Sequence, residues 1–458
     1  MYNMSFLKKI FLSCLLAPIL SFAMTDTEIE DIMKKCVDEG HTPGMVIGII
    51  DESGTKFFKY GQMAVDDPTP IDENAVFETG SISKIFTSLL FTQMVKNGDV
   101  KFDDPIDMYL PKEVSVPEYN GKKITLGHLA THRAGFDYMP ENFIMSDMYN
   151  PFSEYSVEYV YDFLSNFKLT YEPGTKYRYS NVGVVILGHI LSLITNQEFE
   201  NLVSDRLLKS MEMDSTKVNL TDEMENRFAT PHIRDKIVPH WTIKAFEGAG
   251  GLHSTPKDLA RFIEANLGFY KTDVYPILQD AIKTRHPQDL PYLDVGNEWN
   301  ISYQYKPEIV FHGGATGGHQ LFIGFCPETK KGVVVCSNSC SFIYDIGKNI
   351  LNKKWYLKEF RQQAIIVPMM LYKFIGNYQN IDDGSTCSIQ MKDQGHLSTL
   401  MLKWGYYPQI PMYPSTEKDF FLKVKPVEIN FDLHEDNDNI VELMTVNYNG
   451  TIHRFKKR

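Results

Sequence analysis

The distribution of apolar residues predicts strands near the start of the chain, followed by a buried helix. Gly44–Ile50 is an apolar, β-branched run, and Lys56–Tyr60 follows it across the turn residues Asp51–Gly54. This order is typical of an antiparallel hairpin. From Ile82 onward, apolar residues recur at helical spacing until Gly98 ends the pattern. We therefore expect residue 81 to lie at the start of a buried helix.

The middle of the chain is predicted to be mostly helical, and strands return after it. Two apolar runs, 320–325 and 332–337, flank a turn and predict a late hairpin, with another helix over 345–360. Strands, helices and strands in this order predict an α+β fold, in which a helical lobe is inserted into a mainly antiparallel sheet. Helical spacing is found in the segments 126–132, 157–167, 182–195, 200–211 and 258–267.

The length of the chain and a change of pattern near its end predict two domains. The 458 residues exceed the roughly 250 to 300 at which one hydrophobic core stops growing. After about residue 367 the chain has short β-rich runs, punctuated by glycines, which are typical of a small barrel or sandwich. We predict a main domain over 24–366 and an all-β domain over 367–458. The β-rich runs are 388–391, 399–403 and 420–424.

The first 23 residues have the features of a secretory signal peptide. Lys8 and Lys9 precede the apolar run Ile10–Leu20, and Ser21-Phe22-Ala23 fits a small-x-small cleavage site. No other stretch reaches the roughly 18 apolar residues that a spanning helix needs. We expect a secreted or periplasmic protein without a membrane span once residues 1–23 are removed; an uncleaved anchor is the alternative.

Charge and cysteine content narrow the classes of partner. The formal net charge of −12, with no offsetting basic cluster, argues against nucleic acid as a partner. The five cysteines that follow the predicted signal form no C-x-x-C pair, so neither a metal site nor a disulfide framework is expected, and no cofactor is implied. Their pairing stays open. They are Cys36, Cys326, Cys336, Cys340 and Cys387.

Candidate chemistry first appears at Ser81. Residues i and i+3 share a helix face, so Ser81 and Lys84 place an amine one turn beyond a hydroxyl. Serine is a poor nucleophile until a neighbouring base takes its proton. The spacing alone does not distinguish a catalytic serine from a helix cap beside a solvated lysine. The same spacing also occurs at Ser5, Ser53, Ser165, Ser254 and Ser415.

The residues that surround Ser81 distinguish it from the other serines with the same spacing to a lysine. The segment Phe77–Thr87 resembles the active-serine segment of class C β-lactamases and their relatives, which include D-Ala-D-Ala carboxypeptidases, D-aminopeptidases and esterases. Tyr179-Ser180-Asn181 resembles the family's Tyr-x-Asn box. His312–His319 is similar to its Lys-Thr-Gly strand, with histidine in place of the lysine. The three boxes occur in the family's order, and the resemblance, which covers about 40–350, implies a β-lactamase/transpeptidase-like fold.

The resemblance also implies a role for each site residue. Ser81 would attack a carbonyl carbon, while the backbone N–H groups of Ser81 and Ala315 would bind the oxyanion. Lys84 and Tyr179, with ordinary pKa values near 10.4 and 10, are both candidates for the base, and the choice stays open. Asn181 would hydrogen-bond Lys84 and the substrate amide.

Two further segments are interpreted through the same resemblance. His312, Gly313 and Gly314 would line the substrate strand. If His312 holds a substrate carboxylate, acidic substrates should bind less well as pH rises through the pKa of the histidine. The segment Ile124–Gly135 is similar to a structural segment of the family, so His128 and His132 are expected to pack or to hydrogen-bond rather than to act as catalysts.

These observations predict an exported serine hydrolase that cleaves an amide or ester bond through an acyl-enzyme on Ser81. Esterase or D-amino-acid peptidase and carboxypeptidase activity is favoured over β-lactamase activity, because His312 lacks the fixed positive charge that would meet a β-lactam carboxylate. The alternatives are a class C-like β-lactamase and a catalytically silent penicillin-binding-fold module. The expected substrate is a small molecule or peptide, with cell-wall fragments among the candidates, and the oligomeric state is open.

Overall fold

The structure, a computed structural model, describes most of the chain after residue 23. The predicted signal peptide, Cys340 and the predicted boundary at 366/367 lie outside the described residues. Those residues are 24–143, 147, 149–233, 236–288, 290–339, 343–357, 371–394, 397–405, 409–422, 427–434, 437–448 and 450–458.

An antiparallel sheet of nine strands forms the centre of the main domain in the described part of the chain. Its order is β10-β11-β12-β13-β14-β15-β1-β2-β3. The predicted hairpins, β1–β2 and β14–β15, are both present, and β15 pairs with β1, so the start and the end of the domain share one sheet. The strands are β1 Gly44–Asp51, β2 Gly54–Ala64, β3 Asp67–Pro70, β10 His286–Pro287, β11 Leu293–Gly296, β12 Trp299–Ser302, β13 Ile309–Ala315, β14 Gln320–Cys326 and β15 Lys331–Ser337.

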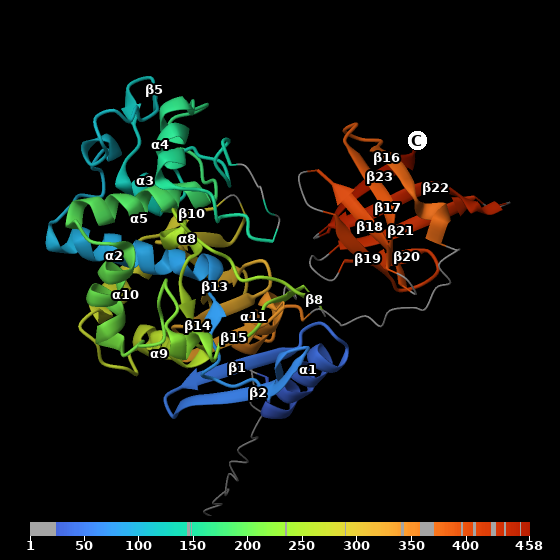
Figure 1. Ribbon diagram of the computed structural model, residues 1–458, viewed down its shortest axis with the longest axis horizontal. Helices are drawn as coiled ribbons and strands as arrows, with labels where there is room; N and C mark the ends of the chain where they lie inside the picture. The colour runs from blue at the N-terminus through green and yellow to red at the C-terminus, as the bar shows by residue number, and fades with distance from the viewer. Residues whose placement is uncertain are drawn as a thin grey trace, which may run out of the picture.

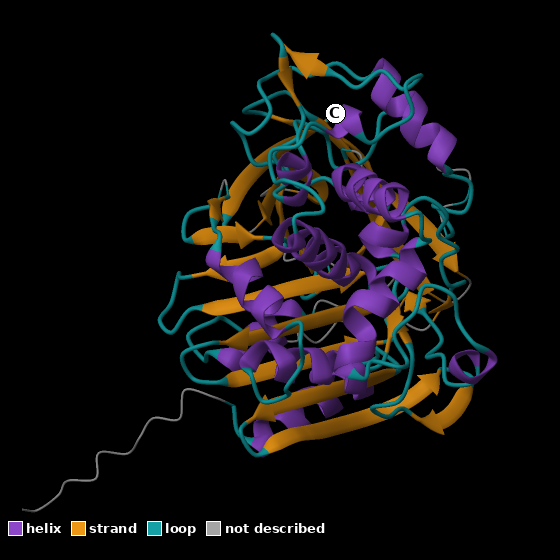
Figure 2. Ribbon diagram, turned by 90° about the vertical axis from the view of Figure 1, so that its left-hand side faces the viewer, coloured by secondary structure: helices purple, strands orange, loops and turns teal. Residues whose placement is uncertain are grey.

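Both faces of this sheet are covered, as the alternation of its side chains requires. Successive residues of a strand point to opposite faces. Val46 packs into the larger core with the helical lobe, whereas Met45 and Ile47 pack with the terminal helices α1 (Asp26–Asp38) and α11 (Tyr344–Leu351). Figure 2 shows helices lying across the strands. The predicted antiparallel sheet flanked by helices is confirmed.

The segments of the lobe that were predicted as helical are helical in the structure, although their bounds differ. The helix after Ser81 is α2, and Gly98 ends it in the left-handed conformation. The segment predicted as one helix over 200–211 is α6 followed by a π turn and a 3-10 turn. The helices of the lobe are α2 Ser83–Asn97, α3 Leu126–Ala130, α4 Val157–Asn166, α5 Asn181–Thr195, α6 Phe199–Val203, α7 Asp222–Glu225, α8 Glu247–Gly250, α9 Pro256–Leu267 and α10 Tyr275–Lys283.

The helix expected over 345–360 ends earlier than predicted. α11 stops at Leu351, because Asn352 is extended (φ −156°) and its side-chain amide donates to the Pro307 carbonyl oxygen at 3.2 Å. Asparagine side chains compete in this way for backbone groups. Residues 358–360 of the predicted helix lie outside the described chain.

Three two-stranded ribbons complete the main domain. The first matters most for function, because β4 leads directly into the turn that holds Ser81 and pairs with β9. The ribbons are β4 Phe77–Glu78 with β9 His253–Ser254, β5 Glu118–Tyr119 with β6 Lys122–Lys123, and β7 His232–Ile233 with β8 Lys236–Ile237.

The C-terminal strands close into a barrel with its own core, which confirms the predicted all-β barrel-like fold (Figure 1). β16 pairs with both β17 and β23, so no strand of the barrel has a free edge. The strands are β16 Gly376–Asn380, β17 Thr386–Gln394, β18 Leu397–Trp404, β19 Ile410–Pro414, β20 Asp419–Phe421, β21 Val427–His434, β22 Asn437–Tyr448 and β23 Thr451–Lys457.

The helices of the described residues differ from a bilayer-spanning segment in length or in apolar content. No single helix there is long and apolar enough to cross a bilayer. α5 together with the helical segment Phe199–Met211 passes the same criterion, but the two are bent by 82°. Most of α5 is buried in the core of the domain.

Candidate active site

Ser81 and Lys84 are hydrogen-bonded at the start of α2. Ser81 lies in the 3-10 turn Gly80–Ile82, and Lys84 in the first turn of the helix that follows. The Lys84 ammonium donates to Ser81 Oγ at 2.9 Å and to the Ala249 carbonyl oxygen at 2.6 Å. Lys84 is only 1% exposed. The predicted i, i+3 relationship therefore places a buried amine against the serine hydroxyl.

Burial lowers the pKa of Lys84 to about 7, although the charge of Glu298 acts in the opposite direction. Removing an ammonium from water penalises its charged form. A substantial fraction of this amine is therefore neutral near neutral pH, and a neutral amine can accept the serine proton.

The environment of Tyr179, the other candidate base, shifts its pKa upward, whereas the pKa of Lys84 is lowered. Burial of its hydroxyl raises the pKa well above the usual value near 10, Glu298 raises it further, and the hydrogen bond with Ser81 only partly offsets both. The Lys84 ammonium lies 5.4 Å from the centre of the tyrosine ring. Tyr179 is therefore a phenol at neutral pH, able to donate a proton, and these environments favour Lys84 as the first base.

Two glycines allow the backbone of β13 to lie against the serine turn. A Cβ on Gly314 would overlap the Thr79 carbonyl oxygen, and a Cβ on Gly80 would lie 2.8 Å from Ala315 N. Gly80 also has a φ of +51°, which favours glycine. This contact places the Ala315 backbone beside the turn that carries Ser81. The two N–H groups expected to form the oxyanion hole thus belong to neighbouring segments.

His312 lies buried on β13, and its environment changes the expectation for its charge. Its Nδ1 is 2.7 Å from the Gly313 carbonyl oxygen, which can only accept, so this nitrogen carries the proton. Burial lowers the pKa of His312 to about 4, against the influence of Glu298. The imidazole is therefore neutral at neutral pH, where the expected charged contact with a substrate carboxylate is not available.

Asn181 begins α5 close to the site, but its contacts differ from the expectation. Its side-chain amide donates to Met139 Sδ at 3.4 Å, and its backbone N–H donates to the Tyr138 carbonyl oxygen at 3.0 Å. Among the described contacts, the Lys84 ammonium is held by Ser81 and Ala249, without Asn181. A substrate amide could therefore take the place of the weak sulfur contact.

Glu298 is a buried carboxylate that the sequence analysis did not identify. It occupies the two-residue turn between β11 and β12, where Asn297 and Glu298 both have positive φ (43° and 72°). Its side chain is 0% exposed. Its charge raises the pKa of Lys84 and of Tyr179. The turn could be predicted from Gly296-Asn297, but no pattern indicates that the next residue points inward.

His132 holds Glu298 and packs on Tyr179. His132 Nε2 lies 2.8 Å from Glu298 Oε2, although the two groups are not aligned as a hydrogen bond. The Ser180 N–H donates to His132 Nδ1 at 3.2 Å, so the ring proton lies on Nε2, toward the carboxylate. The His132 and Tyr179 rings are 4.4 Å apart between centroids. The expected packing and hydrogen-bonding role of His132 is therefore directed at the catalytic residues.

The chain is similar in sequence to beta-lactamases and to a D-alanyl-D-alanine carboxypeptidase. Residues 29–342 match the profile of the family described as Beta-lactamase. The Escherichia coli (strain K12) protein named Beta-lactamase is 25% identical over 350 residues, covering 68% of this chain and 89% of that protein. The D-alanyl-D-alanine-carboxypeptidase/endopeptidase AmpH of the same organism is 26% identical over 306 residues, covering 64% and 78%.

Solved structures share the fold of the main domain. The Beta-Lactamase/D-Alanine Carboxypeptidase from Pseudomonas syringae superposes with a TM-score of 0.61 at 23% identity, covering 69% of this chain and 94% of that one. A class C beta lactamase from Rhodobacter sphaeroides gives a TM-score of 0.59 at 21% identity, covering 68% and 93%.

Proposed function

This chain belongs to the beta-lactamase family and is a serine hydrolase of that family, and we propose that it is an exported enzyme that cleaves ester or amide bonds through an acyl-enzyme on Ser81. The contact that carries the proposal is the 2.9 Å hydrogen bond between Lys84 Nζ and Ser81 Oγ. A buried amine with a lowered pKa is the activating partner that a nucleophilic serine requires.

In the proposed acylation, neutral Lys84 accepts the Ser81 proton while Oγ attacks the carbonyl carbon. The backbone N–H groups of Ser81 and Ala315 donate to the oxygen that becomes negative. The Tyr179 phenol donates its proton to the leaving alkoxide or amine and regains one from the Lys84 ammonium. Water then attacks the acyl-enzyme carbonyl while neutral Lys84 accepts its proton, and the bond to Ser81 breaks as Oγ regains a proton from the Lys84 ammonium.

We further propose that the preferred acyl donors lack a carboxylate next to the scissile bond. The neutral, buried His312 supports this preference, because it offers no fixed positive charge to an anionic substrate group. Simple esters and D-amino-acid esters or amides meet this requirement better than β-lactams do. D-alanine carboxypeptidase activity is the second candidate, favoured by the similarity to AmpH.

Substrate comparison tests the preference. We expect kcat/KM to fall in the order neutral ester, D-alanine amide, peptide ending in free D-Ala-D-Ala, and cephalosporin. His312→Lys should reduce the difference between neutral and acidic substrates, whereas His189→Lys, outside the site, should leave it unchanged. Faster turnover of the peptide with a free C-terminal carboxylate than of its amide would overturn the preference.

The proposal of export rests on the pattern of residues 1–23. Lys8, Lys9 and the apolar run that follows support a signal peptide, with cleavage after Ala23. N-terminal sequencing of the protein recovered from the periplasm or medium should begin at Met24. Recovery of uncleaved protein in the membrane fraction would instead indicate an anchor.

A further inference from the structure

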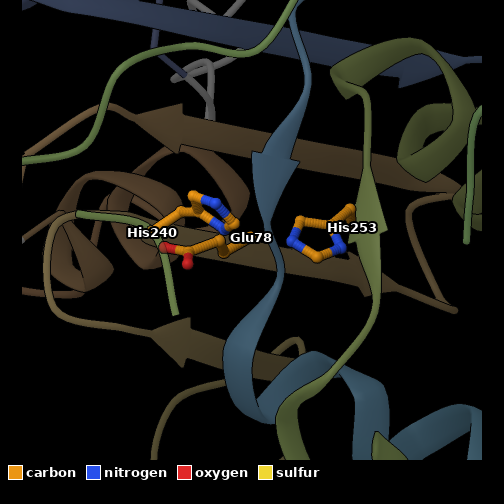
Figure 3. A group of neighbouring side chains, drawn as sticks. All are labelled: Glu78, His240 and His253. Atoms are coloured by element: carbon orange, nitrogen blue, oxygen red, sulfur yellow. The ribbon is translucent and has the colours of Figure 1, made fainter. Parts of the chain in front are cut away.

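Three potential metal ligands lie immediately before the nucleophile turn, outside the proposed acyl-transfer residues. Glu78 ends β4, His253 begins the neighbouring strand β9, and His240 lies in the loop after β8 (Figure 3). Glu78 and His253 are direct partners in the ribbon. One ligand atom from each of the three residues lies within 4.8 Å of the other two.

The Glu78 carboxylate is held in one orientation by donors from other segments. The side chain is 3% exposed. Oε1 accepts from the Trp241 N–H at 2.5 Å, and Oε2 accepts from Thr316 Oγ1 at 2.6 Å. His319 Nδ1, which accepts from the Glu78 backbone N–H at 3.1 Å, lies 3.2 Å from Oε2 without donating to it. Each carboxylate oxygen has two lone pairs. The hydrogen bonds thus fix the carboxylate and leave acceptor capacity on Oε1.

His253 presents an unprotonated nitrogen toward this carboxylate. Its Nδ1 lies 2.9 Å from the Val218 carbonyl oxygen. Because a carbonyl oxygen can only accept, the ring proton lies on Nδ1 and Nε2 carries a lone pair. A backbone carbonyl that orients an imidazole in this way is a common feature around metal ligands.

A phenylalanine ring packs against the two histidines, and the group of three ligands is open to solvent on one side. The Phe228 ring packs edge-on against the rings of His240 and His253, with centroid distances of 5.7 and 5.9 Å. His240 is exposed, so solvent and ions can reach the group from its side. The group therefore has a fixed, buried part and an accessible third ligand.

We propose that Glu78, His240 and His253 bind a zinc ion, with water as the fourth ligand. Two imidazoles and one carboxylate form a ligand set that zinc uses, whereas magnesium and calcium prefer oxygen ligands throughout. Zinc–ligand bonds of about 2.0 to 2.2 Å place tetrahedral ligands roughly 3.4 Å apart. Because the ligand atoms lie within 4.8 Å of one another, they must approach by up to about 1.4 Å when the ion binds, and the exposed His240 side chain can move.

A zinc ion here would join the loop after β8 to the ribbon that leads into Thr79-Gly80-Ser81. It has a structural role, since every step of the proposed acyl transfer uses other groups. Cysteine spacing gave no sign of this site because its ligands are distant in sequence and include no cysteine. The inference does not depend on the proposed function.

Metal titration of the full mature chain tests the site. Protein stripped with a chelator should bind one zinc ion, measured by competition with a chromophoric chelator, and cobalt should give visible bands typical of tetrahedral coordination. His240→Ala, an exposed and therefore tolerated change, should weaken zinc binding at least about tenfold. Zinc should raise the unfolding temperature of the parent protein and not of this variant.

The matched control is His434→Ala. His434 is a half-exposed histidine 3.7 Å from Glu442 in the barrel, so it represents a surface histidine–carboxylate pair. This variant should bind zinc as the parent does. Equal zinc affinity in the parent and in His240→Ala, or no binding by the parent at micromolar zinc, would overturn the site. Labelling of Ser81 should proceed in both variants, so failure of the metal site leaves the proposed function intact.

Discussion

His132 Nε2 lies 2.8 Å from Glu298 Oε2, and the two side chains are 1% and 0% exposed. The pair links the turn between β11 and β12 to the segment after α3, and it places one negative charge where it acts on Lys84, Tyr179 and His312. Neither residue takes part in a chemical step of the proposed acyl transfer. Together they set the electrostatic environment in which the acyl transfer would occur.

The pH dependence of acylation should report the pKa of Lys84. Because the neutral amine is the active form, kcat/KM for a neutral ester should rise through an apparent pKa of about 7. Glu298 raises that pKa, so Glu298→Gln should move the acidic limb to lower pH. A stopped-flow pH series on both proteins measures the shift. An unchanged limb would show that Lys84 is not the group that titrates.

Removing His132 should destabilise the main domain. His132→Ala leaves the Glu298 carboxylate buried without its partner, which costs about 3 kcal/mol of unfolding free energy. Denaturant titration measures this loss, and adding Glu298→Gln to the variant should restore part of it. His189→Ala removes one partly buried bond to the Tyr161 hydroxyl and should cost about 1 kcal/mol. Equal losses in the two single variants would contradict the special role of the pair.

Gly314→Ala should impair acylation without preventing folding. The new methyl group would push β13 away from the Thr79 carbonyl oxygen and so displace the Ala315 N–H. Loss of one oxyanion donor typically lowers kcat by about 10²–10³. Gly183→Ala is the control, because a Cβ there meets its nearest atom at an ordinary 3.6 Å. Comparable rates in the two variants would mean that this approach does not position the oxyanion hole.

The barrel is expected to be dispensable for acylation. Its core is separate from those of the main domain, and each residue of the proposed mechanism lies before residue 358. A chain that ends near Leu357 should fold and still acquire the Ser81 label. If it is folded by circular dichroism yet unlabelled, the barrel contributes to the substrate site.

Much of this arrangement could be predicted from local sequence. The i, i+3 spacing of Ser81 and Lys84 lies within one helix turn, and the hairpin β1–β2 follows from an apolar run and its turn, so short-range rules suffice. Glu298 and Glu78 could not be recognised, because their partners lie far away in sequence. The charge of His312 also depended on burial, which a motif does not specify.

The most direct measurement for the central claim is mass spectrometry after reaction with a fluorophosphonate or an activated ester. One adduct should form on the peptide that contains Ser81, and it should disappear in Ser81→Ala while Ser165→Ala and Ser415→Ala retain it. Lys84→Ala should slow its formation severely in a folded protein. An adduct that persists in Ser81→Ala would contradict the assignment of Ser81 as the nucleophile.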